Sequence, residues 1–496
     1  MVKRVLFWID ATLDHFGAAK YLQNNSDLEM FAIIDANKGK KFYQEQNIVK
    51  FKKKWFLRNH ILKKSTKPDL EYLGRFEKKY KINLWSLVYS DIIFNEYNEY
   101  YKFKKNEILS VLDQMCKFYE VVIDEVNPQY LVIKITDAIN MRLLQLMCSS
   151  LGIKVLSQGF TRFGSRYNFS SECDVIEEMN HHVNENNYVE KNLDELIKYV
   201  KRYAGIEKNW GNEFRTSKLQ WLKGGMKFLS LTLDSSYRDY YWNFGRTPSK
   251  AIKNELLFYI KKKLRKKFLD KNTLKIIPDE KFIYFPLQLE PERTMLIAAP
   301  HFTDQLEVIK KCAKSIPIDY KLFVKEHPMQ KVRAWREKEF YKEILDIPNV
   351  ELIHPEISNE EMIKKTDLVI TVTGTSGLEA AFQLKPTIVL ANVSYQSLPS
   401  VKGIKNIEEL PKCIDEFLNV KVSIGDLNNY VKYVLKNSFE FEEMKLSILT
   451  CNAFYYGGFL LDTEISPSKM KKFIEENEVF YKQLALQLEN IILTKN

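Results

Sequence analysis

The strongest constraint on the fold is a regular alternation of apolar runs and helical segments between residues 321 and 390. Apolar runs predict four strands, at residues 321–324, near Val350, at 367–373 and at 387–390, with helices between them. Strands that alternate with helices at this spacing form a parallel, doubly wound sheet. Ligands of such sheets bind beyond the carboxyl ends of the strands, so the loops at that edge are the first place to look for chemistry.

A glycine-rich loop follows the third of these strands and opens a helix. It reads Thr373-Gly374-Thr375-Ser376-Gly377. The glycines allow a close approach and a sharp turn of the backbone, and the hydroxyls together with the free amides at the helix start can bind an anion. The loop therefore predicts a phosphate site, although such a loop alone can also be an ordinary connection between a strand and a helix.

A second polar loop follows the first strand, where His327 precedes Pro328. Its imidazole can donate to a phosphate oxygen, whereas a lone His-Pro pair can equally be a simple turn. Glu379 lies about one helical turn beyond the glycine-rich loop, where a carboxylate could accept from both hydroxyls of a ribose. The joint occurrence of these features in one strand–helix array favours a nucleotide site.

Three motifs resemble those of the capsular polysaccharide biosynthesis glycosyltransferases, which include Kdo transferases. The motifs are residues 285–292, Lys325-Glu326-His327-Pro328, and residues 373–386. The His-Pro element is similar to that of bacterial sialyltransferases. The resemblance covers residues 280–395 well and the N-terminal half only in outline. It implies a GT-B fold, in which two Rossmann-like domains face each other across a cleft, and a CMP-activated ulosonic acid as donor.

The resemblance also implies roles for individual residues. His327 and the hydroxyls of Thr375 and Ser376 would hold the donor phosphate, and Glu379 would hold the ribose. The other donor-side positions expected from the matched motifs are Gln288, Glu290, Lys325, Glu326, Pro328, Thr373, Gly374 and Gly377.

The first nine residues read as a buried strand whose carboxyl-end loop carries Asp10, Asp14 and His15. In a GT-B enzyme this loop faces the cleft. Asp10 or Asp14 could deprotonate the acceptor or attack the sugar as a nucleophile, and His15 could contact the acceptor; Asp14 could equally cap the next helix. Arg162 and Arg166 follow a later strand and resemble an arginine pair of the capsule family, which suits a carboxylate or phosphate, although they could also be solvated loop residues.

The expected division of the chain has four parts. They are an N-terminal Rossmann-like acceptor domain (1–170) with an insertion of helices and loops (38–105), a helical basic connection (171–278), a C-terminal Rossmann-like nucleotide-sugar domain (279–425) and C-terminal helices that brace the first domain (426–496).

The net charge of +11 suggests an anionic partner, although no motif for nucleic-acid binding accompanies it. Residues 249–272 place apolar side chains along one side of a helix among nine Lys or Arg, which suits contact with an anionic membrane or packing on its own domain. The absence of a long apolar run and of a signal-peptide core predicts a cytoplasmic protein, peripheral at the inner membrane face if this helix binds lipid. The six cysteines are scattered, without metal spacing.

Glycosyl transfer from a CMP-activated ulosonic acid is the function these observations favour, and a single-phosphate leaving group predicts independence from metals and other cofactors. Other readings stay open: a GT-B transferase that uses a UDP-sugar or a CDP-alcohol, a sugar-nucleotide epimerase, and a non-catalytic scaffold of a polysaccharide assembly complex. The sequence leaves the sugar, the acceptor, the linkage, the stereochemical course and the oligomeric state undetermined.

Overall fold

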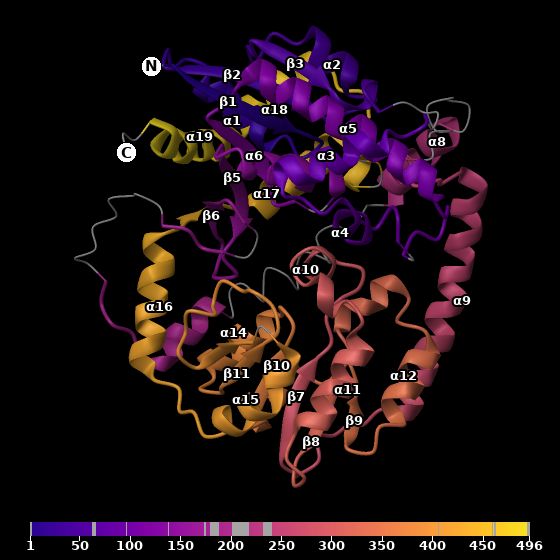
Figure 1. The fold of residues 1–496 in the computed structure, drawn as a ribbon, viewed down its shortest axis with the longest axis vertical. Coiled ribbons are helices and arrows are strands. Elements are labelled where there is room, and N and C mark those ends of the chain that lie inside the picture. Colours follow the sequence, from indigo (N-terminus) through magenta and orange to yellow (C-terminus); the bar gives the residue numbers. More distant parts are fainter. Residues whose placement is uncertain are drawn as a thin grey trace.

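The protein forms two parallel-sheet domains, one above the other in Figure 1. The computed structural model describes residues 2–61, 66–95, 97–136, 138–172, 175–178, 188–200, 218–231, 241–404, 406–458, 460 and 463–493. This architecture confirms the predicted GT-B class, with two Rossmann-like domains and added helices.

The first sheet has the strand order β13-β6-β5-β4-β1-β2-β3. Strands β1 to β5 are parallel, and β6 and β13 form an antiparallel edge. Their bounds are β1 Lys3–Ile9, β2 Leu28–Ile34, β3 Lys53–Phe56, β4 Tyr130–Lys134, β5 Lys154–Phe160, β6 Arg166–Ser170 and β13 Phe439–Glu440. Leu6 and Trp8 of β1 lie in one hydrophobic layer and Phe7 and Ile9 in the other. Burial on both faces explains why β1 is apolar without alternation.

Helices from both ends of the chain cover this sheet. The N-terminal elements are α1 Asp14–Leu22, α2 Lys40–Glu45, η1 Leu57–Asn59, α3 Leu70–Tyr80, α4 Leu84–Tyr89, α5 Lys105–Val126 and α6 Ile139–Ser150. The C-terminal ones are α17 Glu443–Phe454, η7 Tyr456–Gly458, α18 Pro467–Glu476 and α19 Glu478–Leu493. A Cβ on Gly17 would lie 2.2 Å from the Tyr481 ring, so glycine allows α1 and α19 to pack closely. The C-terminal tail thus completes the core of the first domain.

The second sheet is entirely parallel, in the order β12-β11-β10-β7-β8-β9. Its strands are β7 Phe282–Pro286, β8 Lys321–Lys325, β9 Val350–Ile353, β10 Leu368–Thr371, β11 Thr387–Val389 and β12 Val401–Gly403. Its helices are α10 Arg293–Leu296, η4 Pro300–Phe302, α11 Gln305–Ser315, η5 Pro328–Arg333, α12 Lys338–Leu345, α13 Asn359–Lys365, α14 Thr375–Phe382, η6 Ile407–Glu409 and α15 Leu410–Phe417. Three more helices are α8 Lys218–Leu231, α9 Pro248–Asn272 and α16 Ile424–Lys436.

Two local predictions were wrong. The segment 38–105 was expected to hold helices and loops, yet it contains β3, which pairs in parallel with β2 at the edge of the first sheet. The alternative that Arg162 and Arg166 are solvated loop residues was also wrong, because Arg162 is buried and Arg166 begins β6. The turn between β5 and β6 places Phe163 in a hydrophobic cluster with residues of α14 and α16, which ties the first domain to the second.

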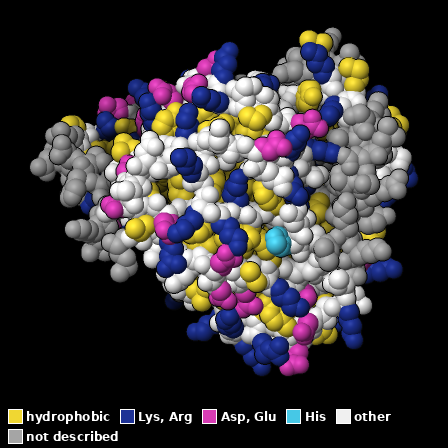
Figure 2. Space-filling model, turned by 90° about the horizontal axis from the view of Figure 1, so that it is seen from above, with side chains coloured by type: hydrophobic (Ala, Val, Ile, Leu, Met, Phe, Trp, Pro, Cys, Tyr) yellow, Lys and Arg dark blue, Asp and Glu magenta, His cyan; other side chains and the backbone are white. Residues whose placement is uncertain are grey.

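Charged side chains are dispersed over the face of the molecule that is seen from above in Figure 2. Seen from above the first domain, Lys and Arg side chains are scattered among acidic and apolar ones and form no single basic patch on that face (Figure 2). Among the described residues, no helix combines the length and the hydrophobicity that crossing a membrane requires.

Candidate active site

The motif loops meet at the topological switch point of the second sheet. β7 lies between β10 and β8, so the loops after β7, β8 and β10 are neighbours at one carboxyl edge. Gln288, just after β7, donates its amide to Thr371 Oγ1 of β10 at 3.0 Å. A doubly wound sheet binds ligands at such a point, because neighbouring loops diverge there and leave a crevice.

The two glycines of the loop after β10 are required because neighbouring atoms leave no room for a Cβ atom. Gly374 has an ordinary φ of −67°, so no left-handed conformation requires a glycine there. A Cβ on Gly374 would lie 2.7 Å from Thr371 Oγ1 and 2.8 Å from Gln288 Nε2. A Cβ on Gly377 would lie 2.6 Å from the hydroxyl of Tyr395. The glycines thus bring the start of α14 close to its neighbours, which is the close approach expected from the sequence.

The N-terminus of α14 is built to receive an anion. Gly374 is the N-cap residue and no side chain caps the helix, so its first amides point outward unpaired by a cap. Thr373 is buried, and its Oγ1 has no hydrogen-bond partner among the described residues. An unpartnered buried hydroxyl costs free energy unless a ligand or water satisfies it. The free amides of α14, the positive end of its helix dipole and the Thr373 hydroxyl together suit a phosphate oxygen.

His327 is held as a neutral imidazole beside this edge. Its Nδ1 accepts the backbone N–H of Met329 at 3.2 Å, which leaves the proton on Nε2. Burial lowers the pKa of His327 to about 4, and the Glu326 carboxylate opposes that shift only in part. Near pH 7 the ring can therefore donate one hydrogen bond from Nε2 without carrying a charge. Pro328 begins the short helix η5 directly behind it.

The lowered pKa predicts a pH-dependent stability. Between about pH 6.5 and pH 4 the unfolded chain binds a proton at His327 that the folded chain does not, so stability falls as pH falls through that window. Urea unfolding at pH 7 and pH 5 should show a smaller loss in His327→Gln than in the unchanged protein. The exposed His301, replaced in the same way, serves as control; equal losses for His327→Gln and the unchanged protein would contradict the prediction.

Glu379 and Ser376 are joined by Asn359, a residue that sequence reasoning missed. Asn359 Nδ2 donates to Glu379 Oε2 and lies 3.2 Å from Ser376 Oγ. Tyr284 orients the amide by donating to Asn359 Oδ1 at 2.8 Å. Asn359 lies in the first turn of α13, which precedes β10 in the sequence, whereas Ser376 and Glu379 lie in α14, which follows β10. Only the fold brings Asn359 to the site. These groups form a polar cluster suited to hydroxyls.

Lys325 and Glu326 lie beneath the site. Lys325 is buried and donates to the carbonyl of Ile357 at 3.1 Å, and burial lowers its pKa to about 8 against the opposing pull of Glu379 and Glu326. Glu326 is fully buried, accepts from Tyr341 at 2.6 Å and forms a two-oxygen ion pair with Arg336.

Glu290 belongs to the same buried network. Its Oε2 accepts from Arg336 Nε at 3.2 Å, and its Oε1 accepts from Gln305. The carboxylates of Glu326 and Glu290 are thus engaged by protein groups, and direct contact of either with a donor stays a prediction.

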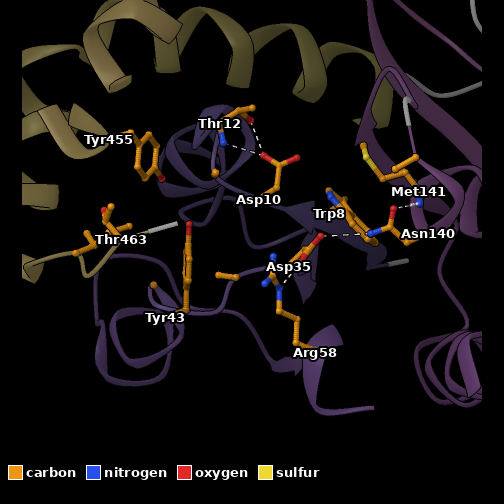
Figure 3. Close-up of a pocket in the computed structure, with 15 residues that line it drawn as sticks. Trp8, Asp10, Thr12, Asp35, Tyr43, Arg58, Asn140, Met141, Tyr455 and Thr463 are labelled. Carbon is orange, nitrogen blue, oxygen red and sulfur yellow. Dashed lines mark hydrogen bonds and ion pairs between the residues drawn. The ribbon is translucent and has the colours of Figure 1, made fainter. Parts of the chain in front are cut away.

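A pocket of about 310 Å³ lies at the carboxyl edge of the first sheet (Figure 3). Arg58 Nε donates to Asp35 Oδ1 at 3.0 Å, and Asn140 Nδ2 donates to Asp35 Oδ2 at 3.3 Å. Trp8 also lines the pocket, and its buried Nε1 has no partner among the described residues. Charged, amide and indole groups in one hollow are suited to a polar, hydroxyl-rich ligand.

Asp10 lies at the wall of this pocket. Its Oδ1 accepts from the backbone and the hydroxyl of Thr12 at 2.9 and 2.7 Å, which fixes the carboxylate in a tight turn (Figure 3). Tyr455 and Thr463 of the C-terminal tail complete the wall from the other side. The pocket therefore depends on segments from both ends of the chain.

Asp14 and His15 are buried in α1, outside the pocket lining. Asp14 forms an ion pair with Lys134 at 2.7 Å, and Lys134 also pairs with Glu443 of α17. Burial raises the pKa of Asp14 to about 7 and lowers that of His15 to about 4, with Lys134 opposing the first shift and reinforcing the second. His15 donates from Nδ1 to the carbonyl of Trp8 at 3.2 Å, so direct contact with an acceptor stays a prediction.

The two arginines connect parts of the chain. Arg162 is buried and donates to the carbonyl of Thr373, the first residue of the glycine-rich loop. Arg166 donates to Ser438 Oγ at 2.7 Å and to the carbonyl of Leu435 at 3.1 Å, at the end of α16. Their roles in binding an acceptor carboxylate stay predictions, whereas the contact of Arg162 couples the first domain to the donor-side loop.

No group of three or more His, Cys, Asp and Glu side chains that could hold a metal ion exists within the described ranges. The adjacent histidines His181 and His182 lie outside the described residues.

Comparisons with known proteins show what the chain is similar to. No curated protein matches the chain. Among solved structures, KpsC β-Kdo 2,7 transferase of Thermosulfurimonas dismutans shares 12% identity over 73% of this chain and 89% of its own, with a TM-score of 0.30. UDP-GlcNAc 2-epimerase of Methanocaldococcus jannaschii shares 15% over 85% and 94%, with a TM-score of 0.26. The N-terminal domain of Candida albicans trehalose-6-phosphate phosphatase shares 11% over 97% of each chain, with a TM-score of 0.29.

A family model described as "Capsule polysaccharide biosynthesis protein" matches residues 224–420, which include α9 and every motif loop of the second sheet. The expected resemblance is thus supported over residues 224–420, less than half of the chain, which are similar to the capsule polysaccharide biosynthesis proteins.

Proposed function

We propose that this protein is a glycosyltransferase that moves a sugar from a nucleotide donor onto a glycan or glycolipid acceptor in capsule polysaccharide biosynthesis. The observation that carries the proposal is the meeting of three motif loops at the switch point of the second sheet, within the family-matched residues. A nucleotide-sugar donor implies a cytoplasmic enzyme.

The donor class we propose is a CMP-activated ulosonic acid such as Kdo or a sialic acid. A single phosphate leaves with the nucleotide, and the site offers groups for one anion: the amides of α14, the Thr373 hydroxyl and His327 Nε2. Hydrogen bonds that are already in place stabilise the charge that develops on the leaving phosphate. Asn359 and Glu379 would bind the ribose hydroxyls, and the hydrogen bond that holds the two side chains together supports this role. A CMP-activated donor contains no diphosphate for a metal ion to bridge, so we expect transfer without a metal ion.

The first-domain pocket is the proposed acceptor site, with Asp10 at its wall as general base or nucleophile. The Asp35–Arg58 pair and Asn140 offer both donors and acceptors to sugar hydroxyls. Arg162 joins this domain to the loop of the donor site, so closure on a donor and positioning of an acceptor are mechanically linked.

Thermal unfolding with CMP, CDP, UMP, UDP and GDP tests the donor class. Ligand at about 100 times its dissociation constant should stabilise the protein by roughly 2.7 kcal/mol. We expect CMP to raise the midpoint, His327→Ala to abolish the rise and His301→Ala, which changes an exposed histidine of the same domain, to retain it.

Other outcomes would overturn parts of the proposal. A rise with UDP or CDP alone would exclude the CMP donor and favour the UDP-sugar or CDP-alcohol reading. Turnover of a nucleotide sugar without an acceptor would favour an epimerase. If no nucleotide binds, a scaffold role replaces catalysis.

A further inference from the structure

Helix α9 runs along one side of the molecule and spans both domains (Figure 1). In its C-terminal part, Arg265 is buried and donates to the carbonyls of Ala334 and Trp335 at 3.2 and 3.0 Å. Near its N-terminus, Lys250 donates to the carbonyl of Tyr100 in the first domain. The helix is therefore fixed at both ends, and its outward face cannot turn onto its own domain.

The outward face of α9 carries large apolar side chains that the described part of the chain leaves exposed. Their exposed fractions lie between 40% and 64%. They are Ile252, Leu256, Leu257, Tyr259, Ile260 and Leu264. On the inward side, Ala251 and Leu269 are already buried, so the core does not require the outward residues. A contiguous exposed apolar face of this kind marks an interaction site.

The same helix is strongly basic. Between Pro248 and Asn272 it holds nine Lys or Arg and only two acidic residues. At 100° per residue, Lys253, Lys263 and Lys267 project among the exposed apolar side chains and not opposite to them. Long lysine stems can lie along an apolar surface while their ammonium groups reach a polar layer.

These features select one occupant. A second copy of the chain would set one row of lysines against another, which is unfavourable. An anionic lipid surface suits both the apolar side chains and the lysines. The apolar side chains would insert among the acyl chains, and the ammonium groups would pair with the lipid phosphates. We propose that the outward face of α9 binds the anionic surface of a lipid bilayer and holds the enzyme there. This goes beyond glycosyl transfer and would bring the two domains to a membrane-borne acceptor.

Co-sedimentation of the full chain with vesicles tests the proposal without donor or acceptor. We expect binding to vesicles of phosphatidylglycerol and phosphatidylcholine, and little to phosphatidylcholine alone. Each lysine removed should lower the partition coefficient about five-fold, so K253Q/K263Q/K267Q should bind about 100-fold more weakly. The variant I252Q/L256Q/I260Q should lose roughly ten-fold or more. Glutamine retains helix propensity, so folding should be preserved.

Matched controls come from other exposed helices. The variants V479Q/L486Q on α19 and K412Q/K472Q on α15 and α18 remove the same kinds of side chain elsewhere and should bind like the unchanged protein. Equal binding to neutral and anionic vesicles, or α9 variants that bind as the unchanged protein does, would overturn the proposal. A lipid-free dimer that I252Q/L256Q/I260Q converts to a monomer would assign the face to a second copy instead. Neither result would affect the nucleotide test of glycosyl transfer.

Discussion

Replacing Arg336 with alanine is expected to lower the free energy of unfolding by about 3–5 kcal/mol, because it leaves buried carboxylates without a cation. Arg336 binds both oxygens of Glu326, one oxygen of Glu290 and the carbonyl of Gln288. Glu326 has no exposed surface, so water cannot replace the lost guanidinium. The site loop would lose its support because Glu326 also binds the backbone N–H of His327 at 2.6 Å.

Urea unfolding of Arg336→Ala measures this loss, with Arg333→Ala as the control. Arg333 is exposed in the same segment, so its removal should change stability by less than about 0.5 kcal/mol. The triple variant E290Q/E326Q/R336M should recover much of the loss, because it leaves none of the three charges unpaired. A loss below about 1 kcal/mol in Arg336→Ala would contradict a supporting role for the pair.

Several strands of both sheets could be predicted because their signals are local. Apolar runs bounded by polar loops identified β1, β8, β10 and β11 within a few residues. β3 was not predicted, because Lys53 and Lys54 make this four-residue edge strand resemble a polar loop. Only its pairing with β2 makes it a strand. The motif loops were found for the same local reason, since each directly follows an apolar run.

The partners of the site residues could not be predicted, because distant segments supply them. Glu326 looked like a donor ligand in its motif, and nothing in the sequence indicated Arg336 ten residues later as its partner. Asn359 reaches Glu379 only through the packing of α13 on α14. Thr463 completes a pocket that begins at Asp10, more than four hundred residues earlier. Long-range pairing of this kind leaves no periodic pattern to read.

Replacing Asp10 with asparagine is expected to lower kcat by about 10²–10⁴-fold while leaving the thermal midpoint nearly unchanged. Of the two carboxylates proposed from the sequence, Asp10 lines the pocket, whereas Asp14 is buried outside its lining. Asparagine can still accept from Thr12 through its amide oxygen, so the local turn should persist. The measurement is transfer to an acceptor with the donor that the nucleotide panel identifies, at saturating donor and acceptor.

Asp14→Asn is the matched comparison, because the pKa of Asp14 gives it a different signature. Burial raises that pKa to about 7, and Lys134 opposes the shift only in part, so the charged form is disfavoured in the folded protein. The unchanged protein should therefore lose stability relative to Asp14→Asn as pH rises from about 4 to about 7, while the kcat of the two stays within a few-fold. A large loss of kcat in Asp14→Asn with near-normal activity in Asp10→Asn would reverse the assignment. That result would place catalysis in the buried cluster of Asp14, Lys134 and Glu443 instead of the open pocket. Lys134 holds this cluster together, because it pairs with both carboxylates.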